Sequence, residues 1–301
     1  MTIERQEWLE QRRKGLGGSD IAAMLGLSKW KSPYQLYLDK RGELPETDDN
    51  EAMYWGRELE PVIRNRYELE TGLKVISNEG IIVDPIYPFM LANLDGRIDE
   101  NQILEIKTAR TGDGWGEIGS ADIPIAYSLQ CQWYLGRTGA AVCDVAVLIG
   151  GSDFRLYQIE ADFALQRMLE EAAIEFWARV EGGDPPEVTT YGDAVERYGR
   201  SNPSGEILAT EEVFAAYQEL VEIKKDIKHY EAKEEEQKAI ICKYLADNYD
   251  TVVAPDGKAI ITWKLAKGTT RFDAKSFEKV HPDLYSQFKT TGEGSRKLLI
   301  K

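Results

Sequence analysis

The segment LEIKTA, residues 104–109, carries the pair of charges in this chain that is best placed to do chemistry. Glu105 and Lys107 alternate with the apolar residues Leu104 and Ile106, which is the two-residue period of a β-strand with one apolar face. The chain contains seven acid-x-Lys pairs, but four lie in a charged helical segment, where this spacing separates the side chains. Only Glu105 and Lys107 occupy an apolar strand, and they are therefore the candidate catalytic pair.

A second carboxylate is expected to face Glu105 from the preceding strand. The polar turn IDENQ separates two apolar runs, and a hairpin centred on residue 100 pairs residues whose numbers sum to 200, with Asp95 opposite Glu105. Facing carboxylates repel each other, and a divalent cation between them removes that repulsion. Mg²⁺ binds two carboxylates together with water and a backbone carbonyl, for which Ile106 is the local candidate. The hairpin therefore predicts a metal site.

Lys107 would stand beside this metal, placed to orient or deprotonate a water or to stabilise charge that develops on a phosphate. The alternative is an ordinary exposed strand face on which Glu105 and Lys107 are simply solvated. Two polar residues near apolar helix faces favour the catalytic interpretation: Glu60 beside Ile63, and Gln130 in IAYSLQCQWYLG. Taken singly, Glu60 and Gln130 are more simply read as buried polar groups with satisfied hydrogen bonds.

The elements that position these residues predict an α/β core. Helices are expected over residues 2–14, 20–26, 53–72, 125–136 and 162–181, and strands within residues 74–83, 89–98, 102–109, 141–151 and 154–161. Ser19 is the expected N-cap of the second helix, and Gly72 the expected end of the third. After a linker at 199–205 come a charged helix over 210–248 and a hairpin within 251–264. The predicted domains are a core, residues 1–200, and an extension, residues 206–301.

Composition narrows the class of protein. The chain has 301 residues and no run of 18 apolar residues, and its N-terminus lacks the apolar stretch of a signal peptide, so we expect a cytoplasmic protein without a membrane segment. Two histidines make a Ser-His or Cys-His catalytic pair improbable, and three scattered cysteines do not form a disulfide framework or a zinc site. The net charge of −15 is mild evidence against nucleic-acid binding, although residues 1–41 and 251–301 are basic.

The motifs WLEQR with GGSD, GRELEP, LDGRIDENQILEIKTA and SLQCQWYLGRTG together resemble the phage alkaline exonucleases of the lambda-exonuclease and YqaJ type, within the PD-(D/E)XK nuclease superfamily. The resemblance covers roughly residues 5–165. It implies a restriction-endonuclease-like α/β core with a mixed central sheet flanked by helices, followed here by a C-terminal helical extension and a small α/β cap. A four-cysteine iron–sulfur cluster, which some related nucleases carry, is excluded by the three cysteines.

The resemblance also implies roles for individual residues. Asp95 and Glu105 are implied metal ligands, Lys107 the catalytic lysine, Glu60 an upstream acid near the metal, and Gln130 a downstream glutamine. By the same likeness, Arg12 and Ser19 are the residues that hold a 5′ phosphate, with Arg13 and Lys14 as alternatives to Arg12.

The implied activity is a Mg²⁺-dependent 5′→3′ exonuclease on linear double-stranded DNA, with Mn²⁺ able to substitute. Its product would be 3′ single-stranded tails for a phage single-strand annealing protein in the bacterial host. Relatives form ring-shaped trimers, so a homo-oligomer is expected, and a ring with basic residues inside would reconcile the acidic charge with a DNA substrate. The alternatives are an endonuclease or nickase of the same superfamily, and a non-catalytic DNA-binding scaffold.

Overall fold

The structure is a computed structural model that describes residues 11–44, 50–76, 80–290, 292 and 294–300. The chain divides into two compact units, Met1–Arg197 and Tyr198–Lys301. Most of the helix predicted over residues 2–14 lies outside the described residues, within which residues 11–13 are helical. The acid-rich segment PETDDNE, residues 45–51, also lies largely outside them.

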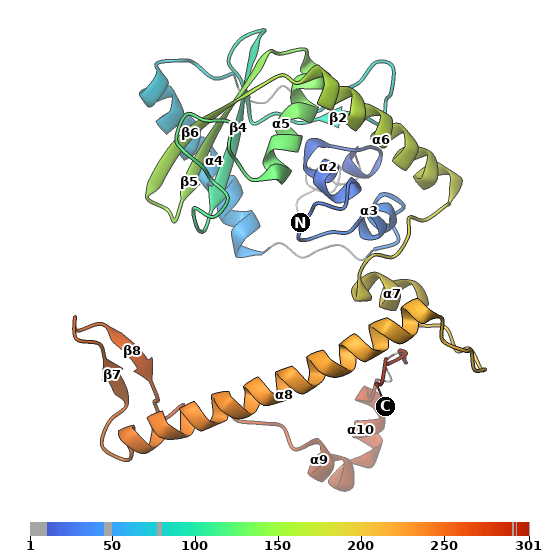
Figure 1. The fold of residues 1–301 in the computed structure, drawn as a ribbon, viewed down its shortest axis with the longest axis vertical. Coiled ribbons are helices and arrows are strands. Elements are labelled where there is room, and N and C mark those ends of the chain that lie inside the picture. The colour runs from blue at the N-terminus through green and yellow to red at the C-terminus, as the bar shows by residue number, and fades with distance from the viewer. Residues whose placement is uncertain (1–10, 45–49, 77–79, 291, 293, 301) are drawn as a thin grey trace. The chain divides into compact units, whose positions relative to one another are not determined.

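A four-stranded mixed sheet forms the centre of the first unit (Figure 1). Its order is β3 (Gly96–Arg97), β4 (Gln102–Ala109), β5 (Val142–Ile149) and β6 (Asp153–Glu160). The β4–β5 pair is parallel, and the pairs on either side of it are antiparallel. The expected α/β fold with a mixed central sheet flanked by helices is therefore confirmed.

Helices cover both faces of this sheet. On one face, α4 (Glu51–Thr71) packs Ile63 and Tyr67 against Leu104 and Ile106 of β4. On the other face lies the larger core, built from α5 (Ile125–Thr138), α6 (Phe163–Gly182), α2 (Gly18–Met24) and α3 (Pro33–Lys40), which pack together with Ile103, Cys143, Val145 and Val147 of the sheet. The amphipathic pattern predicted this role for α4, which ends at Gly72 in the left-handed region with φ 74°.

One expectation about local structure was wrong, and another was met by shorter elements than the apolar runs. Ser19 is not the N-cap of α2, because Gly17 occupies that position and donates its N–H to the Asp20 carboxylate at 3.0 Å. Among the described residues, the apolar runs 74–83 and 89–98 contain the expected strands as the short elements β1 (Ile82–Val83), β2 (Leu91–Ala92) and β3. An apolar run alone does not fix strand length, since pairing also requires a neighbouring strand in register.

The second unit is dominated by one helix, α8 (Glu211–Leu245), which follows a stretch without secondary structure at residues 201–210. Beyond it lie the hairpin of β7 (Thr251–Val253) and β8 (Ala259–Thr262) and two short helices, α9 (Ala274–Val280) and α10 (Pro282–Phe288). The short helix α7 (Tyr191–Tyr198) lies at the boundary between the units. No helix in the described part of the chain combines the length and apolarity needed to cross a membrane.

Candidate active site

The hairpin between β3 and β4 has the predicted register. Gly96 pairs with Leu104 and Arg97 pairs with Ile103, so the residue numbers sum to 200. Asp95 directly precedes β3, and its Oδ2 accepts the backbone N–H of Ile106 at 2.7 Å. In an extended strand the N–H and C=O of one residue point to the same neighbour, so the Ile106 carbonyl also points toward the edge where Asp95 lies.

Glu105 is buried on the face of β4 that looks into the larger core, with 1% of the residue exposed. Its Oε1 accepts hydrogen bonds from the Lys107 ammonium and from Gln130 Nε2, the latter at 2.7 Å. Its Oε2 is buried and has no hydrogen-bond partner. The alternative of a solvated strand face is therefore excluded, and one carboxylate oxygen is left without the partner that burial demands.

Burial and mutual repulsion shift the pKa values of this cluster. Burial, followed by the charge of Asp95, raises the pKa of the Glu105 carboxyl to about 8, although Lys107 opposes the shift. Burial likewise raises the pKa of Asp95. Burial disfavours the charge on Lys107, but the carboxylates of Glu105 and Asp95 outweigh it and raise the pKa of the amine above its ordinary value. Lys107 is therefore an ammonium, which suits charge stabilisation better than proton abstraction.

Glu60 approaches the same cluster from α4. Burial and the neighbouring Asp95 raise the pKa of Glu60, while Arg64 and Lys107 oppose the shift. Arg64 Nη2 donates to Glu60 Oε1 at 2.5 Å and to the backbone carbonyl of Asp95 at 2.9 Å. Glu60 is thus held beside the two hairpin acids with about a third of its side chain exposed.

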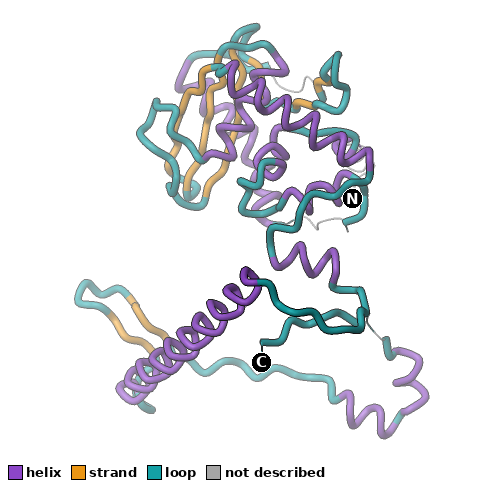
Figure 2. Tube along the Cα trace, turned by 45° about the vertical axis from the view of Figure 1, so that its right-hand side comes forward, coloured by secondary structure: helices purple, strands orange, loops and turns teal. Residues whose placement is uncertain are grey.

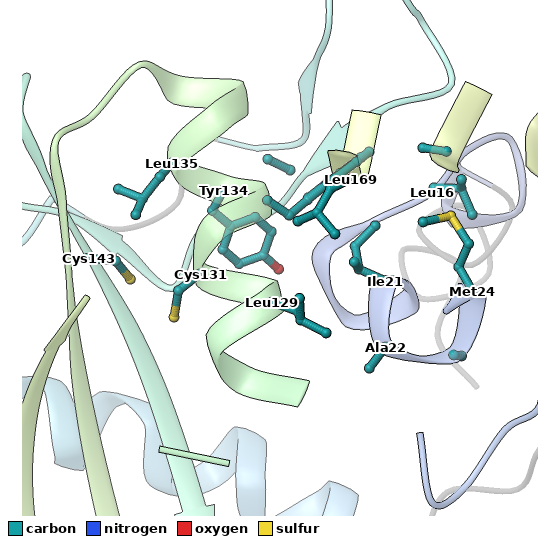
Figure 3. Close-up of a cluster of buried hydrophobic side chains, with 14 of the residues drawn as sticks. Leu16, Ile21, Ala22, Met24, Leu129, Cys131, Tyr134, Leu135, Cys143 and Leu169 are labelled. Atoms are coloured by element: carbon teal, nitrogen blue, oxygen red, sulfur yellow. The ribbon is translucent and has the colours of Figure 1, made fainter. Parts of the chain in front are cut away.

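Gln130 and Tyr134, one turn apart on α5, connect the acids to the N-terminal segment. Gln130 Nε2 also donates to the Tyr134 hydroxyl at 3.1 Å. Tyr134 faces α2 within the buried core (Figure 3), and burial together with Glu105 and Asp95 raises its pKa. A Cβ atom on Gly18 would lie 2.5 Å from the Tyr134 ring and 3.0 Å from Gln130, so glycine permits this close approach of α2 to α5.

The two residues implied to hold a 5′ phosphate contact each other. Arg12 Nη2 donates to Ser19 Oγ at 2.8 Å, and Ser19 is exposed. Behind them, the buried Lys40 ammonium donates to Asp20 at 2.7 Å and to the Arg12 carbonyl at 3.0 Å. This ion pair fixes the backbone of Arg12 against α2.

The oxygen ligands at this site suit a hard cation that takes few of its ligands from the protein. In the residues that the structure describes, no three His, Cys, Asp or Glu side chains gather as a ready-made metal cage. Asp95 and Glu105 provide two carboxylates, the Ile106 carbonyl points to the same edge, and Glu105 Oε2 lacks a partner. Two carboxylates supplemented by water and substrate oxygens match the binding habits of Mg²⁺.

The structure thus brings together Glu60, Asp95, Glu105, Lys107 and Gln130, and separately pairs Arg12 with Ser19. Sequence reasoning missed Arg64, Tyr134 and Lys40. Two of these carried a detectable signal, because Arg64 follows Glu60 and Tyr134 follows Gln130 by four residues on a helix, which places each pair on one face. Lys40 carried no such signal, since its partner Asp20 belongs to another helix.

Comparisons with known proteins identify the family of this chain. The YqaJ-like viral recombinase domain matches residues 7–141. The uncharacterized protein YqaJ of Bacillus subtilis (strain 168) is 35% identical over 297 residues, which cover 95% of this chain and 91% of that protein. The chain belongs to the YqaJ-like viral recombinase family. The family match extends from before Arg12 to just past α5, so it includes every candidate site residue.

Solved structures resemble part of this YqaJ-family protein. The alkaline exonuclease LHK-Exo from Laribacter hongkongensis is 26% identical, covers 60% of this chain and 94% of its own, and superposes with a TM-score of 0.49. A phage related exonuclease from Haemophilus somnus 129PT is 11% identical, covers 56% of this chain and 96% of its own, and has a TM-score of 0.44. Both TM-scores lie below 0.5.

Proposed function

We propose that this YqaJ-family protein is a metal-dependent deoxyribonuclease that digests linear double-stranded DNA from its 5′ ends. The observation that carries the proposal is the partnerless, buried Oε2 of Glu105, which lies beside Asp95 and next to the Lys107 ammonium. Two buried acids whose pKa values are raised, with an ammonium alongside, form a site suited to a cation and a phosphodiester.

Asp95, Glu105 and the Ile106 carbonyl would hold Mg²⁺, or Mn²⁺ in its place, with Glu60 as a further acid at its edge. When bound, the metal supplies activation of a water molecule and neutralisation of phosphate charge. Residues of the chain stabilise the developing charge and orient the metal ligand. Lys107, held as an ammonium, stabilises charge that develops on the phosphate, and Gln130 fixes the orientation of Glu105 through its amide.

Arg12 and Ser19 are the proposed contacts for a terminal 5′ phosphate. The guanidinium and the hydroxyl lie within hydrogen-bond distance of each other, so one phosphate oxygen could accept from both groups. The charge of Arg12 lowers the pKa of Tyr134, whereas the charges of Glu105 and Asp95 raise it. Tyr134 therefore lies near both parts of the proposed site.

Membership of the YqaJ-like viral recombinase family supports a role in recombination. We propose that the product is a duplex with 3′ single-stranded tails, used by a phage single-strand annealing protein in the bacterial cytoplasm. A homo-oligomer, as a ring-shaped trimer, would surround the DNA and place basic residues against it despite the net charge of −15.

The test is digestion of linear duplexes with and without a 5′ phosphate, in Mg²⁺, Mn²⁺ and EDTA, alongside a covalently closed circle. The proposal requires metal-dependent release of nucleotides from the phosphorylated linear duplex and an intact circle. Lys107→Met should lower the rate by about 10²–10³-fold with the fold retained, as removal of one charge-stabilising group does. Lys225→Met, which changes an exposed lysine on α8, is the control. Cleavage of the circle would establish the endonuclease alternative, and an inert wild-type protein the scaffold.

A further inference from the structure

Helix α8 carries a heptad seam. Ten positions of α8 are related by alternating steps of three and four residues, and eight of them are apolar. They are Val213, Ala216, Leu220, Ile223, Ile227, Tyr230, Glu234, Gln237, Ile241 and Tyr244, of which only Glu234 and Gln237 are polar. We call these ten positions the α8 seam; its first residue, Val213, takes heptad position a, and Ala216 takes d. The apolar repeat of 3.5 residues runs through three successive heptads, is interrupted at Glu234 and Gln237, and resumes at Ile241 and Tyr244. Such a repeat is the pattern of a coiled coil, whose seam is buried against a second helix.

Within the described residues of the second unit, the centre of the α8 seam is largely exposed. Ile223, Ile227 and Tyr230, at its centre, are 45%, 52% and 67% exposed. Figure 2 shows α8 as one continuous, uninterrupted helix, and Leu245 is its one buried residue, at the C-terminal end. A solitary helix that exposes a long apolar stripe is unstable relative to one that buries it, so the seam requires a partner helix.

The charges that flank the seam indicate what that partner is. Lys224 and Glu231 take position e, and Asp226 and Lys233 take position g. In the described part of the chain, Lys224, Asp226 and Glu231 have no ion-pair partner. Charges at these positions are therefore available to pair across a helix–helix interface, where they set partner choice and orientation.

A second copy of α8 in antiparallel orientation satisfies all four charges. When position a of one helix meets position d of its partner at full overlap, the paired seam residues sum to 457, so that Val213 meets Tyr244 and Ile227 meets Tyr230. In this register Lys224 lies beside Glu231 of the other copy, and Asp226 lies beside Lys233, each contact occurring twice by symmetry.

A parallel pair of the same helices is disfavoured. Positions g and e five residues apart would then meet, which sets Asp226 against Glu231 and Lys233 against Lys238, both of like charge. It would also place Glu234 of one helix opposite Glu234 of the other within the seam. Only Glu219 with Lys224 would attract.

We infer that α8 is an antiparallel self-association helix, which joins two copies of this chain through the α8 seam. The interface is separate from the proposed nuclease site, which lies in the first unit, and does not depend on the function proposed for that site.

Disulfide trapping in the full chain tests the orientation. In a Cys242→Ser background, Val213→Cys and Tyr244→Cys are prepared as separate proteins, oxidised singly and as a mixture, and read on denaturing gels. We expect a cross-linked dimer from the mixture and none from either protein by itself. Self-linking of Val213→Cys would show a parallel pair, and the absence of any link in the mixture would show no pairing; either result overturns the inference.

Charge reversal gives a second, independent test. An antiparallel pair predicts weaker association of Glu231→Lys, and a parallel pair predicts tighter association. Glu231→Lys sets two lysines together in the antiparallel pair but creates an attraction to Asp226 in the parallel one. By sedimentation equilibrium of the full chain, we expect the dissociation constant of the α8-mediated step to rise about tenfold and to recover in Lys224→Glu/Glu231→Lys. Tighter or unchanged association of Glu231→Lys overturns the inference.

Discussion

Gln130 Nε2 lies 2.7 Å from Glu105 Oε1 and donates a hydrogen bond to it, which leaves the second oxygen of that carboxylate buried and without a donor. The amide and the Lys107 ammonium both bind the same oxygen. The arrangement turns Oε2 away from these donors, so a cation that enters the site would meet an acceptor already fixed in place.

Glu105→Gln is expected to abolish stabilisation by metal while the protein stays folded. At a Mg²⁺ concentration about 100 times its dissociation constant, the ion should stabilise the wild-type protein by about 2.7 kcal/mol over EDTA. The amide of the variant provides no anionic ligand, so its melting temperature should be the same with Mg²⁺ and with EDTA.

Differential scanning calorimetry in the two buffers makes this measurement. Glu222→Gln, on the exposed surface of α8, should keep the full wild-type response to Mg²⁺. A Glu105→Gln protein that is stabilised by Mg²⁺ as strongly as the wild type would remove Glu105 from the ligand set.

Arg12→Ala is expected to reduce the preference for 5′-phosphorylated ends. A charge-assisted hydrogen bond to phosphate contributes about 1.5–3 kcal/mol, so the ratio of kcat/KM for phosphorylated over unphosphorylated duplex should fall by about 10–100-fold. Ser19→Ala should lower the same ratio by a smaller factor. Arg66→Ala, which removes an exposed guanidinium on α4, is the matched control and should leave the ratio unchanged. An unaltered ratio in Arg12→Ala would point to Arg13 or Lys14.

Asp20→Asn is expected to destabilise the protein in a pH-dependent way. Burial opposes ionisation of Asp20, but Lys40 and Arg12 outweigh it and hold its pKa below the ordinary value of 3.8. The ion pair therefore makes its full contribution to the free energy of unfolding above about pH 3.8. This contribution is lost as the pH falls through the lower pKa that Asp20 has in the folded state. Removal of one partner from a buried pair costs about 3–5 kcal/mol, because Lys40 stays buried and charged.

Urea unfolding at pH 7 and pH 3 checks this prediction. The difference in free energy of unfolding between the wild type and Asp20→Asn should be large at pH 7 and smaller at pH 3. Asp39→Asn breaks the more exposed pair with Lys31 and should cost at most about 1 kcal/mol at pH 7. An Asp20→Asn effect that does not change with pH would show that packing, not charge, makes Asp20 important.

Gly18→Ala is expected to destabilise the first unit by about 1–3 kcal/mol, because its Cβ would lie 2.5 Å from the buried Tyr134 ring. Displacement of Tyr134 would also disturb Gln130, so nuclease activity should fall more than stability explains. Gly182→Ala, at the end of α6 with no atom within 4 Å of the added Cβ, should be neutral or slightly stabilising. Thermal melts and initial rates on the same preparations separate the two effects, and wild-type values for Gly18→Ala would contradict the proposed close packing.

Much of the fold was predictable because it depends on local periodicity. The alternation in LEIKTA predicted the faces of β4, the polar turn predicted the hairpin register, and Gly72 predicted the end of α4. Each of these features is encoded within a few residues, where backbone geometry alone relates sequence to position. The N-cap at Gly17 was missed because serine is the commoner capping residue, whereas here the N-cap is a glycine whose N–H donates to the Asp20 side chain.

The sequence by itself determined which residue types the site contains and on which strand face Glu105 and Lys107 lie. Only the tertiary structure decided that this face is buried as well as the apolar one, that Gln130 and Lys107 share a single oxygen of Glu105, and that Lys40 supports Asp20. The physical reason is that side-chain periodicity is a property of one strand or helix, whereas burial, hydrogen-bond partners and pKa shifts depend on elements that are distant along the chain and meet only when it folds.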